Sequence, residues 1–539
     1  MSLDPDPRMQ ALATRLNARR ISRRTALKGA LAGGLALPAL GVQPLGHSAA
    51  AQAAGTMTIA LGVEPITMDP VFADGVIEYH FGVNIMDGLF TTGENIEVVP
   101  RLAESWEQLD ELTWEFKLLP GIFFHNGEAL TSEAVKATYD RTMDPDLAAR
   151  NTWGEDINLE SVEIVDDLTF RFHTSEFTPH MLARLANDHF VFPPRYLAEH
   201  DPTYIARNPV GTGAYMFQEW TAGEQAVLVA NPEFWGEPKP NIETVIWRFI
   251  PETTSRLASL ETGEVDLIDA LPPTAIAEVE SNPELYPVFL DGTRRVYIGL
   301  NTKMAPTDDV RVRQALNYGT DVETICEVIF GGATTRMTNW VEPAFQNPEV
   351  TGYHYDPDLA RQLLAEAGYP DGISVTMDFN RDSSLGMDEF PEAIAISLRE
   401  VGVDVTLNVI EDNIHTDNMR NRETNQLYFR TNASYFDPGL TFDVWRLDHP
   451  GNAAQFDDPE FLELRERLYT EGTPEERLQW SWEAQEIFME GAPAIFLWKE
   501  PDIYALNERV QNFNPNERVQ NFNPTGDERI RLAGMTLTD

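Results

Sequence analysis

The chain has 539 residues, of which 42% are hydrophobic, and a formal net charge of −46 from 40 basic and 86 acidic side chains. The apolar share excludes a disordered chain, and the length gives room for two or three domains with sizeable cores. A surface this acidic repels nucleic acid and anionic lipid, so we exclude both as partners. We interpret the charge as an adaptation to a salty exterior, where salt screens repulsion beyond about 10 Å. An unusually acidic protein from ordinary surroundings is the alternative.

Residues 1–53 have the layout of an export signal. The pair Arg23 and Arg24 is followed by an apolar stretch over 29–42, and Ala51 and Ala53 give the small-x-small pattern that signal peptidases cut. The stretch is shorter than the ~20 apolar residues that a membrane helix needs. The arginine pair and its neighbours resemble a twin-arginine signal, which implies that the twin-arginine translocase exports the folded chain. A basic tail beside an Ala-rich stretch is the alternative.

Cysteine usage indicates where the mature chain works. Cys326 is the single cysteine, so no intramolecular disulfide can form, and no cysteine lies directly after the apolar stretch to carry a lipid. No later stretch is long and apolar enough for a membrane span. We therefore expect the mature chain to be free in the periplasm or an equivalent extracellular space, without a lipid anchor and without membrane insertion.

The pattern downstream of the leader predicts strands and helices in alternation. The predicted strands cover residues 57–63, 112–118, 245–250 and 403–410. An amphipathic helix is predicted over 391–400, directly before the last of these strands. Strands and helices mixed over this length predict α/β domains.

Three further helices are predicted from their starting signals. Thr131 is placed to cap one of them. Asp356 and Pro357 supply an N-cap and a first-turn proline for the second. Thr473 and Glu476 have the spacing of a capping box for the third.

The common catalytic signatures are missing from the sequence. It has no HExxH, GxSxG, GxxxxGK[ST] or paired CxxC motif. The histidines are scattered without metal-ligand spacing, so we expect no metal and no cofactor. His125, beside the turn signal Asn126-Gly127, is interpreted as a structural turn residue. Carboxylates are too abundant for any acid/base pair to be singled out. These absences favour a role other than catalysis.

Residues 507–515 (NERVQNFNP) are repeated without change at 516–524. The unit is far shorter than a solenoid repeat and occurs twice. We interpret it as a duplication tolerated in a surface loop, and we assign it no function.

Seven groups of short motifs follow one another along the chain. They are PRLAESW (100–106), FHNG with LTSEAV (124–135), VGTGAY (210–215), NPEFW (231–235), LETGEVD (260–266), DVRVRQAL (309–316) and LLAEAGY (363–369). In this order they resemble the extracellular solute-binding proteins of family 5, the dipeptide, oligopeptide and nickel type. We interpret Trp106, Tyr215 and Trp235 within them as core residues, so the motifs identify a fold and not a ligand.

The resemblance implies an α/β fold of the two-lobed periplasmic-binding-protein type, with an extra subdomain in the first lobe and a hinge between the lobes. The ligand would bind between the lobes, which would close over it. The expected ranges are 57–98, 206–300 and 496–539 for lobe I, 99–205 for the subdomain, and 301–495 for lobe II. Hinge strands are expected near 297–301 and 494–499.

The resemblance also implies ligand contacts from lobe II. In peptide-binding members, an aspartate near the end of this lobe pairs with the ligand's α-amino group, and Asp437 is the matching carboxylate. From their residue types, Tyr435, Phe436 and Trp445 would line an apolar pocket. Arg381 would receive a ligand carboxylate, although no motif of the family matches at this position. We expect Asp437 to be unpaired and hydrated until a ligand binds. An Asp-Pro turn is the alternative for this residue.

Three functional hypotheses follow. The leading one is the substrate-binding component of an ABC importer, which captures a small polar ligand, a peptide or amino-acid derivative, and works with ABC permease subunits. The second keeps the fold but binds a nickel chelate, a sugar or an opine. The third, from another class, is a secreted hydrolase that uses two of the many carboxylates.

Overall fold

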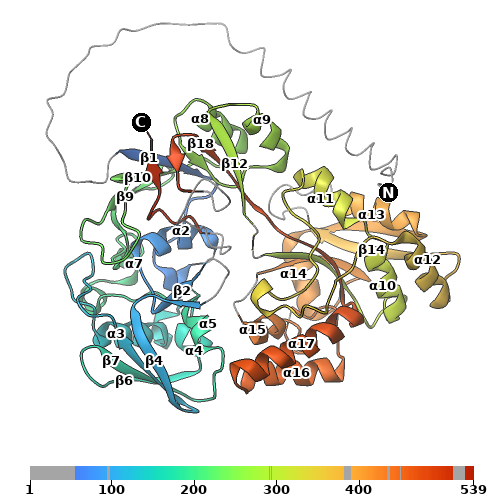
Figure 1. Cartoon of the computed structure of the whole chain (residues 1–539), viewed down its shortest axis with the longest axis horizontal. Coiled ribbons are helices and arrows are strands. Elements are labelled where there is room, and N and C mark those ends of the chain that lie inside the picture. Colours follow the sequence, from blue (N-terminus) through green and yellow to red (C-terminus); the bar gives the residue numbers. More distant parts are fainter. Residues whose placement is uncertain are drawn as a thin grey trace, which may run out of the picture.

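The computed structural model describes residues 55–73, 75–93, 98–187, 189–290, 292, 294–380, 390–433, 437–449, 451–513 and 529–538. These residues form two lobes that lie side by side, each built on its own sheet (Figure 1). The residues singled out from the sequence that lie outside the described ranges are Arg23, Arg24, Ala51, Ala53, Arg381, Tyr435 and Phe436.

The first lobe is built on a seven-stranded sheet. Across the sheet, the strands are β12 (Leu285–Leu290), β18 (Asp502–Asn507), β11 (Leu267–Ile268), β1 (Thr56–Leu61), β10 (Thr244–Phe249), β9 (Gln225–Ala230) and β8 (Tyr215–Thr221). β1 is parallel to both of its neighbours, and the remaining pairs are antiparallel. The helices of this part are α2 (Val76–Ile85), α7 (Pro202–Ile205), α8 (Thr253–Glu261) and α9 (Ile276–Glu280).

An extra subdomain is inserted in the first lobe. Its four-stranded antiparallel sheet has the order β4 (Ala103–Asp110), β5 (Thr113–Leu118), β7 (Thr169–Thr174) and β6 (Leu159–Ile164). Its helices are α3 (Ser132–Thr142), α4 (Trp153–Asp156), α5 (Met181–Leu185) and α6 (Pro194–Glu199). The short strands β2 (Phe90–Thr92) and β3 (Val98–Pro100) pair where the chain enters it. Buried residues of the subdomain and the seven-stranded sheet form one continuous core.

The second lobe is built on a five-stranded sheet. Across the sheet, the strands are β15 (Val403–Ile410), β14 (Ile373–Asn380), β16 (Leu427–Asn432), β13 (Arg295–Leu300) and β17 (Ala494–Lys499). Its helices are α10 (Val310–Tyr318), α11 (Val322–Phe330), α12 (Pro357–Glu366), α13 (Phe390–Glu400), α14 (Asp412–Asn421), α15 (Pro438–Asp443), α16 (Pro459–Thr470) and α17 (Pro474–Gly491).

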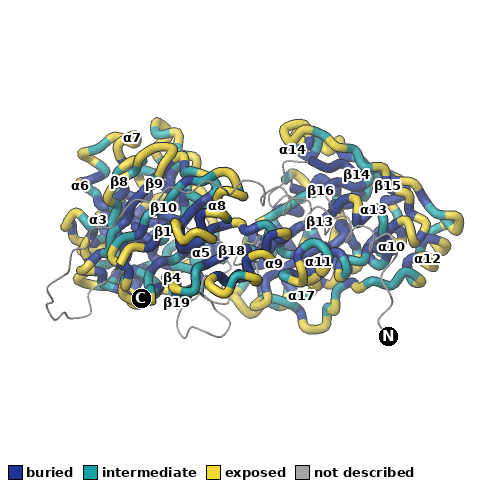
Figure 2. Tube along the Cα trace, turned by 90° about the horizontal axis from the view of Figure 1, so that it is seen from above, coloured by how far each residue is buried: buried dark blue, intermediate teal, exposed yellow. Residues whose placement is uncertain are grey.

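Both faces of this sheet are covered, and the strand residues are mostly buried (Figure 2). Because side chains alternate along a strand, Val296 and Ile298 of β13 face one core and Tyr297 faces the other. The Val296 side packs against α10 to α13. The Tyr297 side packs against α15, α16 and α17, which contribute Phe442, Phe461 and Phe488.

The chain crosses between the lobes after β12 and again after β17. β12 belongs to the first lobe's sheet and β13 to the second lobe's sheet. On the way back, β17 belongs to the second lobe's sheet and β18 to the first lobe's sheet. The expected lobe I ranges therefore differ from the sheets, because they include β13 and part of β17. Both strands are apolar runs that would suit a central strand of either sheet, so their pattern could not assign them. The other range limits stay predictions.

Two of the three helix caps predicted from the sequence agree with the structure. The Thr473 hydroxyl accepts from the Glu476 amide at 3.3 Å, and the Glu476 carboxylate accepts from the Thr473 amide at 2.9 Å. Asp356 accepts from Leu359 N at 2.9 Å, as an N-cap does. Thr131 precedes α3 but makes no side-chain cap bond.

Two sequence interpretations are wrong. Trp106 is 38% exposed and is therefore not a core residue, although Tyr215 is fully buried. The first copy of the duplicated segment is not a loop throughout, because it contains the strand β19 (Val510–Gln511), which pairs with β20 (Thr536–Leu537). Val510 and Phe513 are fully buried, so the described part of this copy packs into the first lobe's core. The second copy lies outside the described ranges.

Candidate functional site

Two described parts of the second lobe mark where it approaches the first. Asn432, the last residue of β16, lies opposite Arg295, the first residue of β13 after the chain crosses between lobes. Leu440 of α15 packs against Ala183 of α5, in the first lobe's subdomain. The start of α15 therefore lies on the side of the second lobe that faces the first.

Asp437 caps α15 and is paired inside the protein. Its Oδ1 accepts from the amides of Gly439 at 2.8 Å and Leu440 at 3.2 Å, and from Arg477 Nη2 at 2.6 Å. The side chains of Asp437 and Arg477 are each 8% exposed. The expectation of an unpaired, hydrated carboxylate is thus wrong, because α17 brings Arg477 to it. A ligand role for Asp437 stays a prediction.

Arg477 also links the two lobes. Its Nε donates to Leu468 O of α16 at 2.9 Å, and its Nη1 donates to Pro179 O of the subdomain at 3.4 Å. Beside this contact, the rings of His180 and Tyr469 lie 4.6 Å apart. Burial lowers the pKa of His180 to about 4, against a smaller opposing effect of Asp437. The imidazole is therefore neutral at pH 7.

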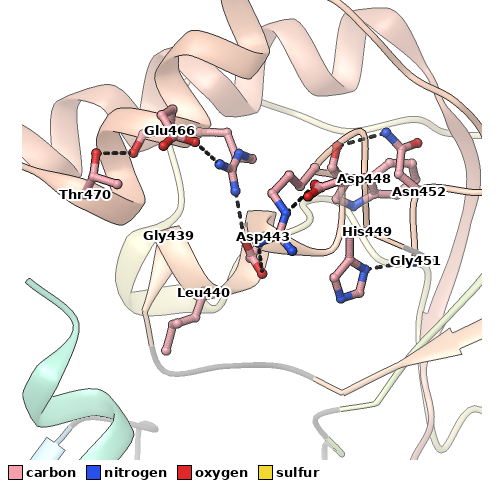
Figure 3. Close-up of polar contacts among 12 residues, drawn as sticks. Gly439, Leu440, Asp443, Asp448, His449, Gly451, Asn452, Glu466 and Thr470 are labelled. Atoms are coloured by element: carbon pink, nitrogen blue, oxygen red, sulfur yellow. Dashed lines mark hydrogen bonds and ion pairs between the residues drawn. The ribbon is translucent and has the colours of Figure 1, made fainter. Parts of the chain in front are cut away.

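A second ion-pair network fixes α15 on α16. Asp443 accepts from Arg465 Nη1 at 2.7 Å and from Arg446 Nη1 at 3.2 Å (Figure 3). The Leu440 side chain, one turn earlier on α15, points away from this network. α15 thus presents an apolar residue to the first lobe while its other side is held by charged groups.

Trp445 lies in the second lobe's core. It has no exposed surface, and its ring centroid lies 4.8 Å from Phe488 and 5.4 Å from Trp340. In this conformation it offers no surface to a pocket. Its indole Nε1 is buried and has no acceptor among the described residues.

A row of polar residues lies on the same face of the sheet as Trp445. Tyr297 of β13 is opposite Arg430 of β16, and Asn432 follows Arg430 on the same face. Burial raises the pKa of Tyr297, and the adjacent guanidinium of Arg430 opposes the rise. The sequence interpretation missed Arg430, because its position became visible only through the pairing of β13 with β16.

No cluster of His, Cys, Asp and Glu side chains suited to a metal ion occurs in the part of the chain that the structure describes. Within the same ranges, no helix combines the length and apolar character needed to cross a bilayer. Cys326 is a free, buried thiol.

Two lobes joined by a double crossing of the chain are the fold of a two-lobed solute-binding protein. The family model of bacterial extracellular solute-binding proteins, family 5 (Middle), matches residues 97–453. The chain belongs to this family.

Similar proteins agree with this assignment. Heme-binding protein A of Haemophilus influenzae is 29% identical over 77% of this chain and 82% of its own length. The glutathione-binding protein GsiB of Salmonella paratyphi A is 30% identical over 63% of this chain and 67% of its own length. The solved structure of HbpA2 from Haemophilus parasuis has a TM-score of 0.78 and 26% identity, over 90% of this chain and all of that one. The relatives are binding proteins of transporters, and this chain accordingly serves in the import of a small ligand.

Proposed function

We propose that the chain captures a small polar ligand between its lobes and delivers it to the permease subunits of an ABC importer. The contact of Leu440 in the second lobe with Ala183 in the first carries this proposal, since it lies beside Asp437 where the two lobes face each other. A molecule bound there would touch both lobes, so that binding would favour the closed arrangement.

A peptide or an amino-acid derivative is the ligand class that we favour. By their names, the similar proteins bind heme or glutathione. This supports a small ligand for this chain, although the two named ligands differ in their chemistry. The family resemblance assigns a ligand contact to Asp437, and the residue types of Tyr435, Phe436, Trp445 and Arg381 suit further contacts. We retain all five as proposals. A ligand ammonium at Asp437 would have to share the carboxylate with Arg477, and Trp445 would have to gain exposed surface.

The place of action is part of the proposal. The leader with Arg23 and Arg24 supports export of the folded chain by the twin-arginine translocase. The lack of a cysteine after the apolar stretch supports a mature chain without a lipid anchor.

The test separates capture from turnover. Purified protein is incubated with a metabolite extract and washed, and the compounds that stay bound are released by denaturation and identified by mass spectrometry. Capture predicts one unmodified compound at close to one molecule per chain. Compounds that disappear from the extract with formation of products, and no stoichiometric retention, would favour the hydrolase alternative. An opine, a sugar or a nickel chelate in the bound fraction would replace the peptide class and leave the capture role in place.

A further inference from the structure

A single buried carboxylate joins the ends of the two strands at which the chain enters and leaves the second lobe. Arg295 is the first residue of β13 and Lys499 is the last residue of β17, and the two lie opposite each other in the sheet. Glu342 Oε1 accepts from Arg295 Nη2 at 3.0 Å, and Glu342 Oε2 accepts from Lys499 Nζ. The side chains of Arg295 and Glu342 are 0% and 1% exposed. Because a buried ion pair is costly to break, this carboxylate holds both strand ends firmly.

Glu342 follows a segment of the second lobe that is itself attached to β17. Thr334 Oγ1 donates to Lys499 O at 2.9 Å, and Met337 N donates to Leu497 O at 2.7 Å. The segment that leads to Glu342 therefore runs beside β17, the strand at the edge of the sheet. Glu342 thus ties the strand ends to the second lobe.

The backbone pairing of β13 with β17 is interrupted close to these ends. The register shifts between Val296 and Tyr297, so the pairs Arg295–Lys499 and Val296–Trp498 lie beyond the shift. An irregularity of this kind disrupts the ladder of hydrogen bonds locally and bends the strand. The side-chain contacts of Glu342 therefore contribute more to holding the end of β17 than they would beside a regular ladder.

The two crossings of the chain touch each other directly beside this carboxylate. Glu500 N donates to Arg294 O at 2.8 Å, and a Cβ added at Gly292 would lie 1.9 Å from Glu500 O. On the other side of the crossings, Leu290 and Asp502 are paired in the first lobe's sheet. The lobes are therefore joined by two short connections in close contact, which must bend together.

The end of β13 is also linked to the helix that meets the first lobe. Arg295 Nη1 donates to Ala433 O at 3.2 Å, and the Arg295 guanidinium lies over the Trp340 ring, 5.1 Å from its centroid. Trp340 Nε1 donates to Thr441 O of α15 at 3.4 Å. Movement of Arg295 would therefore disturb α15, whose Leu440 packs on the first lobe.

We propose that Glu342 is a positioning residue for the movement of the lobes. Its carboxylate keeps the ends of β13 and β17 fixed to the second lobe, so that the lobes turn about the two connections and not within these strands. The inference rests on the proposed function in one respect, since it takes the lobes to move when a ligand binds. A movement confined in this way has a defined axis and leaves α15 in place.

The experiment compares the wild type with Glu342→Gln and the control Asp69→Asn. Asp69 is fully buried and pairs with Arg141 inside the first lobe, so the control removes the same charge from a buried ion pair away from the crossings. Both variants are expected to lose stability. Only the variant at the strand ends should change how the lobes move.

Spin labels on the two lobes report this movement in the ligand-free protein. They are placed at Ser175→Cys in the first lobe's subdomain and at Glu463→Cys in the second lobe, both exposed positions. Cys326 is 2% exposed and stays unlabelled. Pulsed electron paramagnetic resonance measures the distribution of distances between the labels. We expect a broader distribution for Glu342→Gln than for the wild type, and a wild-type distribution for Asp69→Asn.

Hydrogen–deuterium exchange shows where the protein has loosened. In Glu342→Gln, the amides at the ends of β13 and β17 should exchange about tenfold or more faster than in the wild type. Strands β14 and β15 of the same sheet should keep their exchange rates. Faster exchange throughout the sheet would indicate a general loss of stability and would contradict a local role.

A second variant carries the test if Glu342→Gln does not fold. Lys499→Gln keeps the buried pair of Glu342 with Arg295 and changes a side chain that is 19% exposed. This variant releases the end of β17 alone. We expect a smaller broadening of the distances, and faster exchange at the end of β17 than at the end of β13.

The outcomes separate this inference from the proposed function, because no ligand is used. A distance distribution of Glu342→Gln as narrow as that of the wild type, or an equal broadening in Asp69→Asn, would contradict the role of Glu342. If Glu342→Gln does not fold, an unchanged distribution in Lys499→Gln would contradict it. The capture of a ligand would stand in each of these cases. A wild-type protein that retains no compound would contradict capture and leave the distance measurements valid.

Discussion

The Arg477 guanidinium donates to the Asp437 carboxylate at 2.6 Å, and this pair joins the start of α15 to α17 at the point where the second lobe meets the first. Asp437 therefore acts in the ligand-free protein as a helix cap and as a counter-ion. Arg477 reaches the first lobe through Pro179 O. Any ligand that uses Asp437 must act on a group that already supports the contact between the lobes.

Asp437→Asn is expected to lower the free energy of unfolding of the ligand-free protein by about 3 kcal/mol, because Arg477 would stay buried without its counter-ion. Denaturant titration measures the loss. The control is Asp309→Asn, since Asp309 also caps a helix and pairs with an arginine, Arg311, but in an exposed pair with side chains 27% and 44% exposed. There the loss should stay below about 1 kcal/mol. Equal losses in the two variants would contradict a structural role of the buried pair.

Asp437→Asn also tests the proposed contact with a ligand ammonium. If Asp437 binds an α-amino group, the variant should bind an amine-bearing compound a few hundredfold more weakly, a loss of ~3–5 kcal/mol. Calorimetry with the retained compound measures this change. An unchanged affinity would limit Asp437 to its cap and its pair with Arg477.

Ala183→Glu is expected to separate the lobes at α5, because Ala183 is 7% exposed and packs on Leu440, which is 2% exposed. A buried carboxylate without a partner opposes this contact. Small-angle X-ray scattering of the ligand-free protein should show a larger radius of gyration. Ser175→Glu adds the same charge at an exposed position of the same subdomain and should leave the scattering unchanged. Identical curves for Ala183→Glu and wild type would show that the contact does not hold the lobes.

His180 should make the stability fall as the pH is lowered. Its pKa is lowered by burial from 6.5 to about 4, so the unfolded chain takes up the proton first and stability is lost between these values. From pH 7 to pH 5 the loss from this group is about 2 kcal/mol. Burial is the main cause of this lowered pKa; Arg184 and Arg477 lower it further, and Asp437 and the Tyr469 backbone oppose the shift. Denaturation at both pH values should show a smaller difference for His180→Gln than for wild type. The same difference in both proteins would remove His180 as the cause.

Salt should raise the melting temperature. With a net charge of −46, and more after loss of the basic leader, self-repulsion opposes the compact state in dilute buffer and molar salt screens it. Thermal unfolding of the mature chain from low to molar NaCl measures the effect. A flat melting temperature would argue against adaptation to a salty exterior.

Replacement of Arg23 and Arg24 by Lys should keep the precursor in the cytoplasm, because the twin-arginine receptor reads that pair. Cell fractionation of the producing strain measures it. Arg19 and Arg20, also adjacent and also changed to Lys, provide the control and should not alter export. Normal periplasmic recovery of the Arg23/Arg24 variant would remove the twin-arginine interpretation.

The features that could be predicted from the sequence are those whose signals are close in the chain. Thr473 and Glu476 satisfy each other's amides across three residues, and Asp356 caps its own helix. The ordered family motifs predicted the two-lobed fold because they span most of the chain. The lobe I ranges expected from the sequence included β13 and part of β17, which belong to the second lobe's sheet, since an apolar run fits the centre of either sheet.

The site could be predicted only in part, because its contacts join distant residues. Asp437 meets Arg477 across 40 positions, so the sequence pattern showed a carboxylate beside a proline and not its counter-ion. Arg430 comes opposite Tyr297 only when β16 pairs with β13. Trp445 is an aromatic residue of the type that lines pockets. Its burial against Phe488 and Trp340 depends on how α15 to α17 pack, which the sequence does not show.

A crystal structure of the protein with the compound retained from the metabolite extract tests the central claim most directly. The account predicts one ligand molecule between the lobes, in contact with residues of both. Ligand density on the outer surface of one lobe, or confined to a single lobe, would contradict it.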